Sequence, residues 1–269
     1  MAVRKRFGGP SLSGFRGRYV VVKLGGTGDI EAGRVGLDIN SLVEAGARVV
    51  VAHGGGDVLT AWLKSHRRRS RWIDGLRVTD ARTRDDAVMI YRGVVAPAVI
   101  GKLVQAGVSA VGIGGPDGGV ILVRRQSPEL GFVGAIRAVQ MNLLEDLATN
   151  GHVPVISPLG LGPRGELYNV NGDDVAGAVA RAGRAAALVF LTDVDGVRDS
   201  DGRVLPILDR RTARALLQQG VIVGGMAPKV RSALRLLRDV EAVVIANAAH
   251  PHVLRDALGA RQAGTRIVL

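Results

Sequence analysis

Hydrophobic and polar positions along the chain predict a repeated strand–helix pattern. Short β-branched apolar runs are separated by longer segments in which apolar residues recur every three or four positions. The runs that predict strands are Tyr19–Leu24, Ala47–Ala52, Ala110–Ile113, Val153–Ser157, Ala187–Leu191 and Ala242–Ile245. The periodic segments that predict helices are Asp86–Gln105, Asn142–Asn150, Asp174–Arg181 and Arg211–Gln219. Strands that alternate with amphipathic helices indicate an α/β protein with a largely parallel, doubly wound sheet.

One segment departs from this pattern. Val120–Val139 reads as two short strands around a turn, which predicts a hairpin inserted on the α/β scaffold. Glycine-rich motifs precede residue 180 and a second strand–turn–helix set follows it, so we place a division between two lobes near that position. The 269 residues suffice for one large α/β domain or two closely associated lobes.

Composition narrows the class of protein. Cysteine is absent, which excludes disulfides, thiolate nucleophiles and thiolate metal sites. No apolar run reaches the roughly 18 residues of a membrane helix, and the first 18 residues are basic without an apolar core. We therefore expect a cytoplasmic protein without a membrane partner.

The formal net charge of +12 comes mostly from arginine and has three readings. They are nucleic-acid binding, attraction of small anionic substrates, and an arginine-rich genome. Aromatic residues make up only 3% of the chain, so stacking platforms for single-stranded nucleic acid are not expected. The densest basic cluster is Lys64–Trp72, which is either a solvated loop or part of a site.

Two strands end in glycine. They are "VVKLGG", which carries Lys23, and "VVVAHGGGD", which carries His53. Bare backbone N–H groups at such positions can cradle phosphate oxygens. Neither loop matches the Walker pattern or the dinucleotide-binding glycine pattern, so any phosphate chemistry here is of another design.

Three later stretches add polar groups suited to anionic ligands. "DGLRVTD" holds Arg77, whose guanidinium can bind a carboxylate bidentately. "YNVNGDD" gathers four Asn and Asp residues before a small-residue helix, more than one helix cap requires. "GVIVGGMAPKV" carries an isolated lysine, Lys229, in an apolar, glycine-rich run.

The motifs "VVKLGG", "HGGG", "GLRVTD", "GFVG", "YNVNGDD", "LTDVDGV", "GGMAPKV" and "GTRI" follow one another in an order that resembles the amino-acid kinase superfamily. Within it the pattern is most similar to the acetylglutamate kinases, over Arg18 to Leu269. The resemblance implies a three-layer αβα sandwich with an open, mainly parallel central sheet. It implies a basic extension over residues 1–18, an acyl-amino-acid-binding lobe over 19–180 and an ATP-binding lobe over 181–269, in one continuous domain. The reaction would be phosphoryl transfer from ATP to the side-chain carboxylate of N-acetyl-L-glutamate, with Mg²⁺ carried by ATP rather than by the protein.

The resemblance also implies roles for individual residues. Lys23 and Lys229 would offset the negative charge of the reacting groups, and Asp173 would hold both lysines. Arg77 would bind the α-carboxylate and Asn169 the acyl amino acid. The glycines that would face the phosphoryl group and the substrate are Gly25, Gly26, Gly55 and Gly56. The residues that would bind the nucleotide are Asp193, Val194, Gly196, Val221, Ile222 and Val223.

Departures from the family pattern leave alternatives open. Asp174 follows Asp173 directly, so either carboxylate could organise the lysines, although the motif favours Asp173. Related kinases act on glutamate or aminoadipate attached to an acidic carrier protein, and the Lys64–Trp72 cluster would suit such a partner. A non-catalytic descendant of the fold, regulatory or nucleic-acid-binding, and a phosphonate- or isoprenoid-directed kinase that uses His53 are further candidates. In arginine-sensitive relatives, a longer N-terminal helix links dimers into a hexameric ring. The glycines in Met1–Gly17 disfavour such a helix, so we expect a homodimer without arginine feedback.

Overall fold

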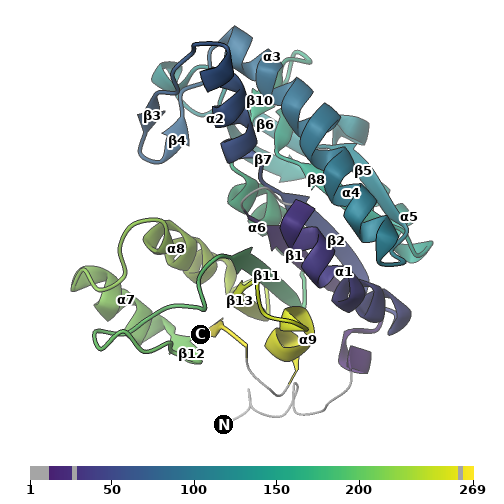
Figure 1. The fold of residues 1–269 in the computed structure, drawn as a ribbon, viewed down its shortest axis with the longest axis vertical. Helices are drawn as coiled ribbons and strands as arrows, with labels where there is room; N and C mark the ends of the chain where they lie inside the picture. The colour runs from purple at the N-terminus through teal and green to yellow at the C-terminus, as the bar shows by residue number, and fades with distance from the viewer. Residues whose placement is uncertain (1–11, 26–28, 260–262) are drawn as a thin grey trace.

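The computed structural model describes residues 12–25, 29–259 and 263–269, and its centre is an eight-stranded sheet (Figure 1). The strand order is β12-β14-β13-β11-β1-β2-β8-β5. The strands are β1 (Tyr19–Leu24), β2 (Arg48–His53), β5 (Ala110–Gly114), β8 (Val153–Ser157), β11 (Ala187–Thr192), β12 (Ile207–Asp209), β13 (Ala242–Asn247) and β14 (Thr265–Val268). The six strands from β13 to β5 pair in parallel, whereas β14 runs antiparallel to β13 and parallel to β12. All six predicted strands are confirmed, and the sheet also includes β12 and β14.

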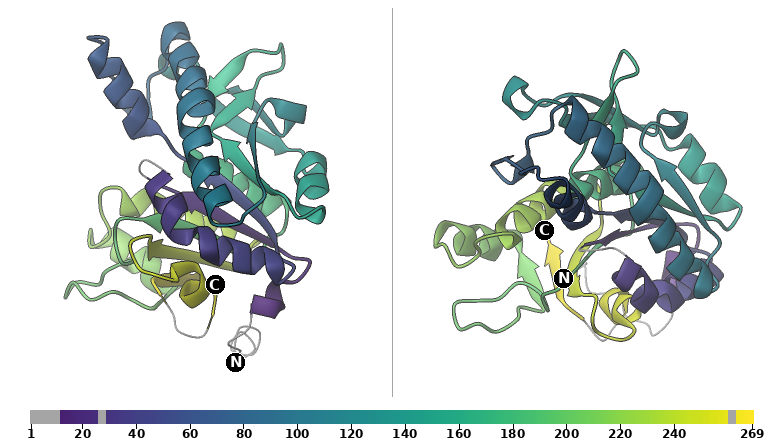
Figure 2. Two further views of the ribbon diagram at one scale, coloured as in Figure 1. Left: turned by 45° about the vertical axis from the view of Figure 1, so that its right-hand side comes forward. Right: turned by 45° about the horizontal axis from the view of Figure 1, so that its top comes forward.

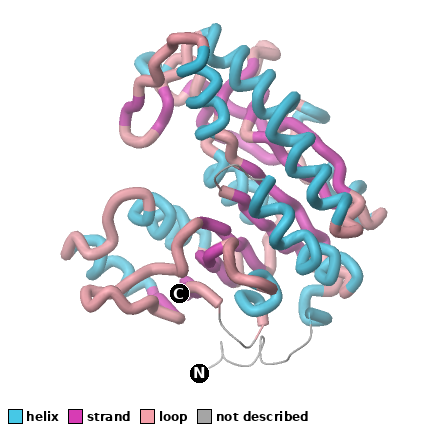
Figure 3. The backbone as a smooth tube through the Cα atoms, viewed as in Figure 1, coloured by secondary structure: helices cyan, strands magenta, loops and turns pink. Residues whose placement is uncertain are grey.

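Helices cover both faces of this sheet (Figure 3). On one face α1 (Asp29–Glu44), α4 (Ala96–Gln105) and α9 (Val253–Leu258) pack on one core cluster. On the other face α5 (Asn142–Thr149), α6 (Gly172–Ala182), α7 (Arg210–Gln218) and α8 (Met226–Leu236) pack on a second. The predicted three-layer αβα sandwich with a mainly parallel sheet is therefore confirmed.

The alternation of side chains along β1 determines where Lys23 lies. Val20, Val22 and Leu24 belong to the core cluster under α1, whereas Tyr19 and Val21 belong to the cluster under α6. Because successive side chains of a strand point to opposite faces, Lys23 extends to the α6 side of the sheet.

The predicted helix over Asp86–Gln105 is longer and is interrupted. It begins with α3 (Ala81–Ile90), passes through a π-helical turn at Tyr91–Val95 and continues as α4. Asp80 caps α3 by accepting a hydrogen bond from the Thr83 amide at 2.7 Å, which explains the earlier start. By length and composition, Ala81–Gln105 is the one helix in the described residues that could cross a membrane. In this structure its inner side packs against α1 and β5.

Two smaller sheets and the helix α2 (Gly56–Ser65) lie in the same half of the molecule as β5 (Figure 1, Figure 2). The predicted hairpin is confirmed as β6 (Ile121–Arg125) paired antiparallel with β7 (Gly134–Val139). With β9 (Leu159–Leu161) and β10 (Leu167–Asn169) it forms a four-stranded sheet. A two-stranded hairpin of β3 (Trp72–Ile73) and β4 (Leu76–Arg77) follows α2.

Candidate active site

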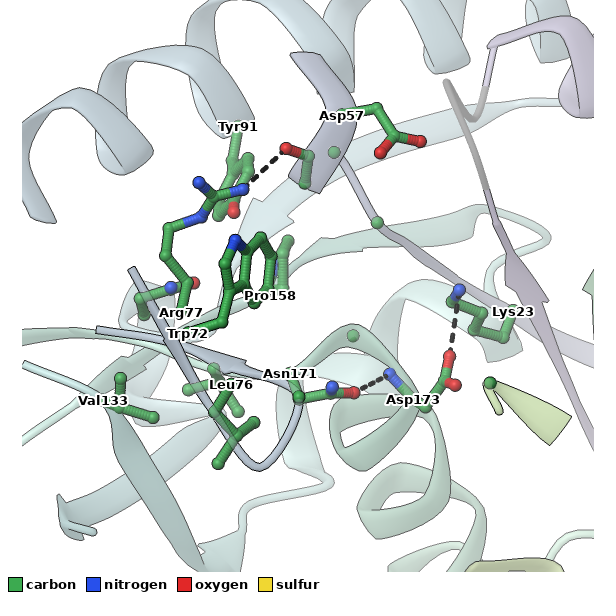
Figure 4. Close-up of a pocket in the computed structure, with 18 of the residues that line it drawn as sticks. Lys23, Asp57, Trp72, Leu76, Arg77, Tyr91, Val133, Pro158, Asn171 and Asp173 are labelled. Atoms are coloured by element: carbon green, nitrogen blue, oxygen red, sulfur yellow. Dashed lines mark hydrogen bonds and ion pairs between the residues drawn. The ribbon is translucent and has the colours of Figure 1, made fainter. Parts of the chain in front are cut away.

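The chain reverses its direction of winding at β1. From β1 it first builds β2, β8 and β5 on one side and later returns to add β11 and β13 on the other. In an open parallel sheet, a ligand crevice forms at the carboxyl ends of the strands at such a switch point. A cavity of about 590 Å³ opens there, lined by Lys23 at the end of β1 and by residues of several loops (Figure 4).

Lys23, Asp173 and Lys229 form a charged group across this cavity. The Lys23 Nζ lies 2.9 Å from Asp173 Oδ1, and the Lys229 Nζ lies 2.9 Å from Asp173 Oδ2. Burial alone would raise the pKa of Asp173, but the two ammonium groups hold the pKa of that carboxyl below its usual value. The carboxylate therefore stays ionised and fixes both lysines.

The start of α6 sets the position of Asp173. Asn171 caps the helix, because its Oδ1 accepts from the amides of Asp173 at 2.8 Å and Asp174 at 3.3 Å. Asp174 makes no ion pair with either lysine and its side chain is exposed. Of the two adjacent carboxylates, Asp173 is thus the one that organises the lysines.

The glycine loop after β2 brings the backbone to the cavity. Gly55 has φ +134, and a Cβ there would lie 2.9 Å from the Tyr91 ring, so the backbone can take this path only with glycine. Gly56 begins α2, and no side chain caps the helix. Its first N–H groups are therefore available to an anion. Gly25 directly follows β1 and is the last described residue before residues 26–28, so Gly26 lies outside the described residues.

Arg77 forms the far wall of the cavity with its side chain buried. Its Nη2 donates to the Gly56 carbonyl at 2.9 Å and to Thr60 Oγ1 at 2.7 Å, and its Nη1 donates to Ser70 Oγ. The guanidinium also stacks on Trp72, with 4.4 Å between its Cζ and the ring centroid. Burial lowers the pKa of Arg77. No Asp or Glu of the described residues forms an ion pair with it, so this wall offers a fixed cation to a ligand carboxylate.

Asn169 lies at the end of β10, buried beside Arg77. Its Nδ2 donates to Thr79 Oγ1 at 3.2 Å, and the Thr79 hydroxyl in turn donates to the Arg77 carbonyl at 2.8 Å. The amide plane of Asn169 is therefore oriented, and the residue lines the same cavity.

His53 takes no direct part in this cavity. It is fully buried, its Nδ1 donates to the Gly54 carbonyl at 2.6 Å, and its Nε2 accepts from Ser157 Oγ at 3.0 Å. Burial lowers the pKa of His53 to about 4, so the ring is neutral at neutral pH. With both nitrogens occupied, the ring supports the glycine loop and is not available as a phosphate ligand.

The predicted nucleotide residues lie apart from the cavity lining. Asp193 and Val194 are exposed after β11, and Gly196 packs against Thr265. The turn between α7 and α8 holds Val221, Ile222 and Val223, of which Ile222 is buried and Val223 is 62% exposed. Both stretches lie in the half of the molecule that also supplies Lys229 (Figure 1).

The structure adds cavity residues that the sequence did not indicate. Trp72 and Tyr91 line it, and Thr60 and Ser70 hold Arg77. Thr60 follows Gly56 by one helical turn, a spacing that sequence could have shown. Tyr91 gives no such signal, because it reaches the cavity from the middle of a long helix at the π-helical turn.

Comparison with known proteins places the chain in a family. The model of the amino acid kinase family matches residues 18–247. The acetylglutamate kinase of Rubrobacter xylanophilus is 44% identical over 250 residues, covering 93% of this chain and 97% of that protein. The acetylglutamate kinase of Rhodospirillum rubrum is 40% identical over 276 residues, covering 96% and 89%.

A solved structure agrees in fold. The N-acetylglutamate synthase of Neisseria gonorrhoeae, complexed with coenzyme A and N-acetyl-glutamate, superposes with a TM-score of 0.85 at 25% identity. The match covers 96% of this chain and 61% of that longer one. Taken with the matches along nearly the full length, this shows that the chain belongs to the amino acid kinase family and groups with its acetylglutamate kinases.

Proposed function

We propose that the protein transfers the γ-phosphoryl group of ATP to the side-chain carboxylate of N-acetyl-L-glutamate, as a step of arginine biosynthesis in the cytoplasm. The observation that carries the proposal is one cavity with two cationic ends. Lys23 and Lys229 are held 2.9 Å from Asp173 at one end, and the buried Arg77 lines the other. Curated relatives that are 40–44% identical over most of this chain are named acetylglutamate kinase.

The reaction brings two anions together. An oxygen of the substrate carboxylate attacks the γ-phosphorus, the bond from that phosphorus to the β,γ-bridging oxygen breaks, and an acyl phosphate and ADP result without a proton transfer. Such transfers depend on positioning and charge stabilisation rather than on covalent help from the protein. Lys23 and the uncapped start of α2 would stabilise the transferring phosphoryl group, and Lys229 the charge that develops on ADP.

Mg²⁺ would supply charge neutralisation on the phosphates of ATP. Among the described residues no group of three or more His, Cys, Asp and Glu could hold a metal ion. We therefore assign the ion's coordination mainly to phosphate oxygens and water. This distribution follows the preference of Mg²⁺ for sites that combine few carboxylates with substrate phosphates.

Arg77 and Asn169 are assigned to the amino-acid end of the substrate. The fixed guanidinium would bind the α-carboxylate, and Asn169 the acetamido group or the same carboxylate. Gly55 and Gly56 would donate backbone N–H groups on the same side of the cavity.

ATP is assigned to the half of the molecule that supplies Lys229. Val194 and Val223 are large apolar side chains that stay 38% and 62% exposed, which suits a surface for the adenine ring. Asp193 and Gly196 on the first loop, with Val221 and Ile222 on the second, would complete this subsite.

A homodimer is also proposed, and a helix surface supports it. Along Ala81–Gln105, Met89, Val94 and Val104 are 55%, 50% and 54% exposed. Between Asp85 and Lys102 the exposed residues of this helix are uncharged, and the partly exposed Arg92 is paired with Asp117 at 2.8 Å, in a chain with a formal net charge of +12. A second copy could approach this surface without like-charge repulsion. Val94→Arg should then halve the mass measured by light scattering, and an unchanged mass would move the interface elsewhere.

The test of the activity is trapping of the acyl phosphate by hydroxylamine in the presence of ATP and Mg²⁺. N-acetyl-L-glutamate should give hydroxamate and free L-glutamate should not, because we assign the cavity to an acylated substrate. An acidic carrier protein remains the second candidate acceptor, favoured by the exposed arginines of Lys64–Trp72. Turnover only with a carrier-bound substrate would replace the first proposal by the second.

A further inference from the structure

The basic segment Lys64–Trp72 has two kinds of arginine. Arg67, Arg69 and Arg71 are exposed, whereas Arg68 and Ser70 between them are partly buried. The segment is therefore not uniformly solvated, because alternate side chains turn toward the protein. The inward side chains contact the helix α3 and the Arg77 guanidinium, and the outward ones face solvent.

Arg68 attaches this segment to the first two turns of α3. Its guanidinium pairs with Asp86 Oδ2, donates to Thr83 Oγ1 at 2.7 Å and lies 3.6 Å from Asp80 Oδ1. Asp86 is buried, and its second oxygen accepts from Trp62 Nε1 at 3.2 Å. Both Asp86 oxygens are thus occupied, and the Arg68 side chain is only 20% exposed. A buried, multiply bonded pair of this kind fixes local geometry because either partner alone would be left buried and unpaired.

The segment Lys64–Trp72, held in this way, supplies contacts that fix Arg77. Ser70, two residues after Arg68, accepts from Arg77 Nη1, and the Arg71 carbonyl accepts from the Val78 amide at 2.9 Å. Trp72 pairs with Arg77 across β3 and β4, and its ring stacks on the guanidinium. The position of Arg77 therefore depends on where the segment lies.

We propose that Arg68 and Asp86 are positioning residues for substrate binding. Neither residue lines the cavity, but their ion pair anchors the segment that orients the Arg77 guanidinium toward the substrate α-carboxylate. The inference rests on the proposed function, since it concerns how that site binds its acyl amino acid. It assigns the basic cluster a role in substrate affinity that does not depend on an acidic partner.

The test compares Arg68→Gln and Asp86→Asn, which break the ion pair, with Arg69→Gln, which removes an arginine charge from the same segment and leaves the pair intact. Arg68→Gln and Asp86→Asn should raise the KM for N-acetyl-L-glutamate about tenfold, because small displacements of a positioning group weaken productive binding. Their kcat and the KM for ATP should change less than threefold. Arg69→Gln, the matched control at an exposed arginine, should change all three constants less than twofold. Arg68→Lys should restore the KM only in part, because an ammonium group lacks the planar fork of the guanidinium.

Hydrogen exchange provides a second measurement that needs no substrate. In Arg68→Gln, amides of residues 66–78 should exchange at least tenfold faster than in the wild type, and in Arg69→Gln they should not. Unchanged exchange in both variants would overturn the proposal, as would equal effects of Arg68→Gln and Arg69→Gln on the KM. A fall in kcat together with a rise in both KM values would also overturn it, because that result indicates general destabilisation. If the wild type fails to phosphorylate N-acetyl-L-glutamate, the proposed function fails separately, and exchange alone then decides whether Arg68 anchors the segment.

Discussion

Asp173→Asn should separate catalysis from nucleotide binding. The substitution keeps the shape of the side chain but removes the charge that holds Lys23 and Lys229, each 2.9 Å away. A charge-assisted hydrogen bond of this kind contributes about 1.5–3 kcal/mol. Asparagine keeps one oxygen that can accept from one lysine, so the stabilisation lost lies between the value of one bond and that of both, about 1.5–6 kcal/mol. Because both bonds share one carboxylate, their contributions are not additive. At about 1.4 kcal/mol per tenfold in rate, we expect kcat to fall by about 10²–10³.

The affinity for ATP should not fall with kcat and should stay equal or rise. The three groups carry a net charge of +1 in the wild type and would carry +2 in the variant. One extra unit charge about 6 Å from a phosphate adds roughly 2–3 kcal/mol of attraction at an effective dielectric constant of 20. Partial exposure reduces this value, so we expect the Kd of ATP to stay equal or fall by up to about tenfold.

The assay is steady-state ADP release together with calorimetric binding of a non-hydrolysable ATP analogue. Asp174→Asn is the control, because this neighbouring carboxylate is exposed and makes no ion pair with either lysine. Its kcat should stay within threefold of the wild type. Retention of kcat in Asp173→Asn, or weaker nucleotide binding with normal kcat, would refute the assignment of Asp173 as the organiser of the lysines.

Three further substitutions or conditions test other parts of the site. Arg77→Ala should raise the KM for N-acetyl-L-glutamate at least about 100-fold and the KM for ATP less than threefold. The reason is that a buried, charged hydrogen-bonding group contributes about 3 kcal/mol or more to binding. Equal rises in both KM values would contradict the assignment of Arg77 to the amino-acid end. Gly55→Ala should lower the free energy of unfolding by about 1–3 kcal/mol and reduce kcat, because φ is +134 and the new Cβ would meet Tyr91 at 2.9 Å; an unchanged urea midpoint would count against this. Stability should fall as the pH drops from about 6.5 to 4, because the unfolded state protonates His53 while burial holds its pKa in the fold at about 4. The loss attributable to this group is about 3 kcal/mol, and His53→Asn should flatten that part of the urea-midpoint profile.

The sequence predicted the central strands because they are continuous β-branched runs. β12 and β14 were not predicted. β12 (Ile207–Asp209) has only three residues and is exposed at both ends. α8 was also not predicted. Its first turn holds Pro228, which is compatible with a helix start, but the preceding glycines made the stretch read as a turn around an isolated Lys229.

The candidate site divides in the same way. Lys23, Asp173, Lys229, Arg77 and Asn169 were identified from motif order, and the structure brings all five to one cavity. What sequence could not show is the set of supports around them. Ser70 and Arg68 contact their partners only because the segment after α2 folds back onto α3, and this depends on tertiary packing rather than on any local pattern.

The most direct test of the central claim is acyl phosphate formation by the purified protein, trapped with hydroxylamine, with N-acetyl-L-glutamate and L-glutamate measured side by side. We predict hydroxamate with the acetylated substrate, at a rate that Lys23→Ala lowers at least about 100-fold, because the substitution removes the cation that we assign to the transferring phosphoryl group. Absence of hydroxamate from the wild type with N-acetyl-L-glutamate, under conditions where the protein is folded and binds ATP, would contradict the account.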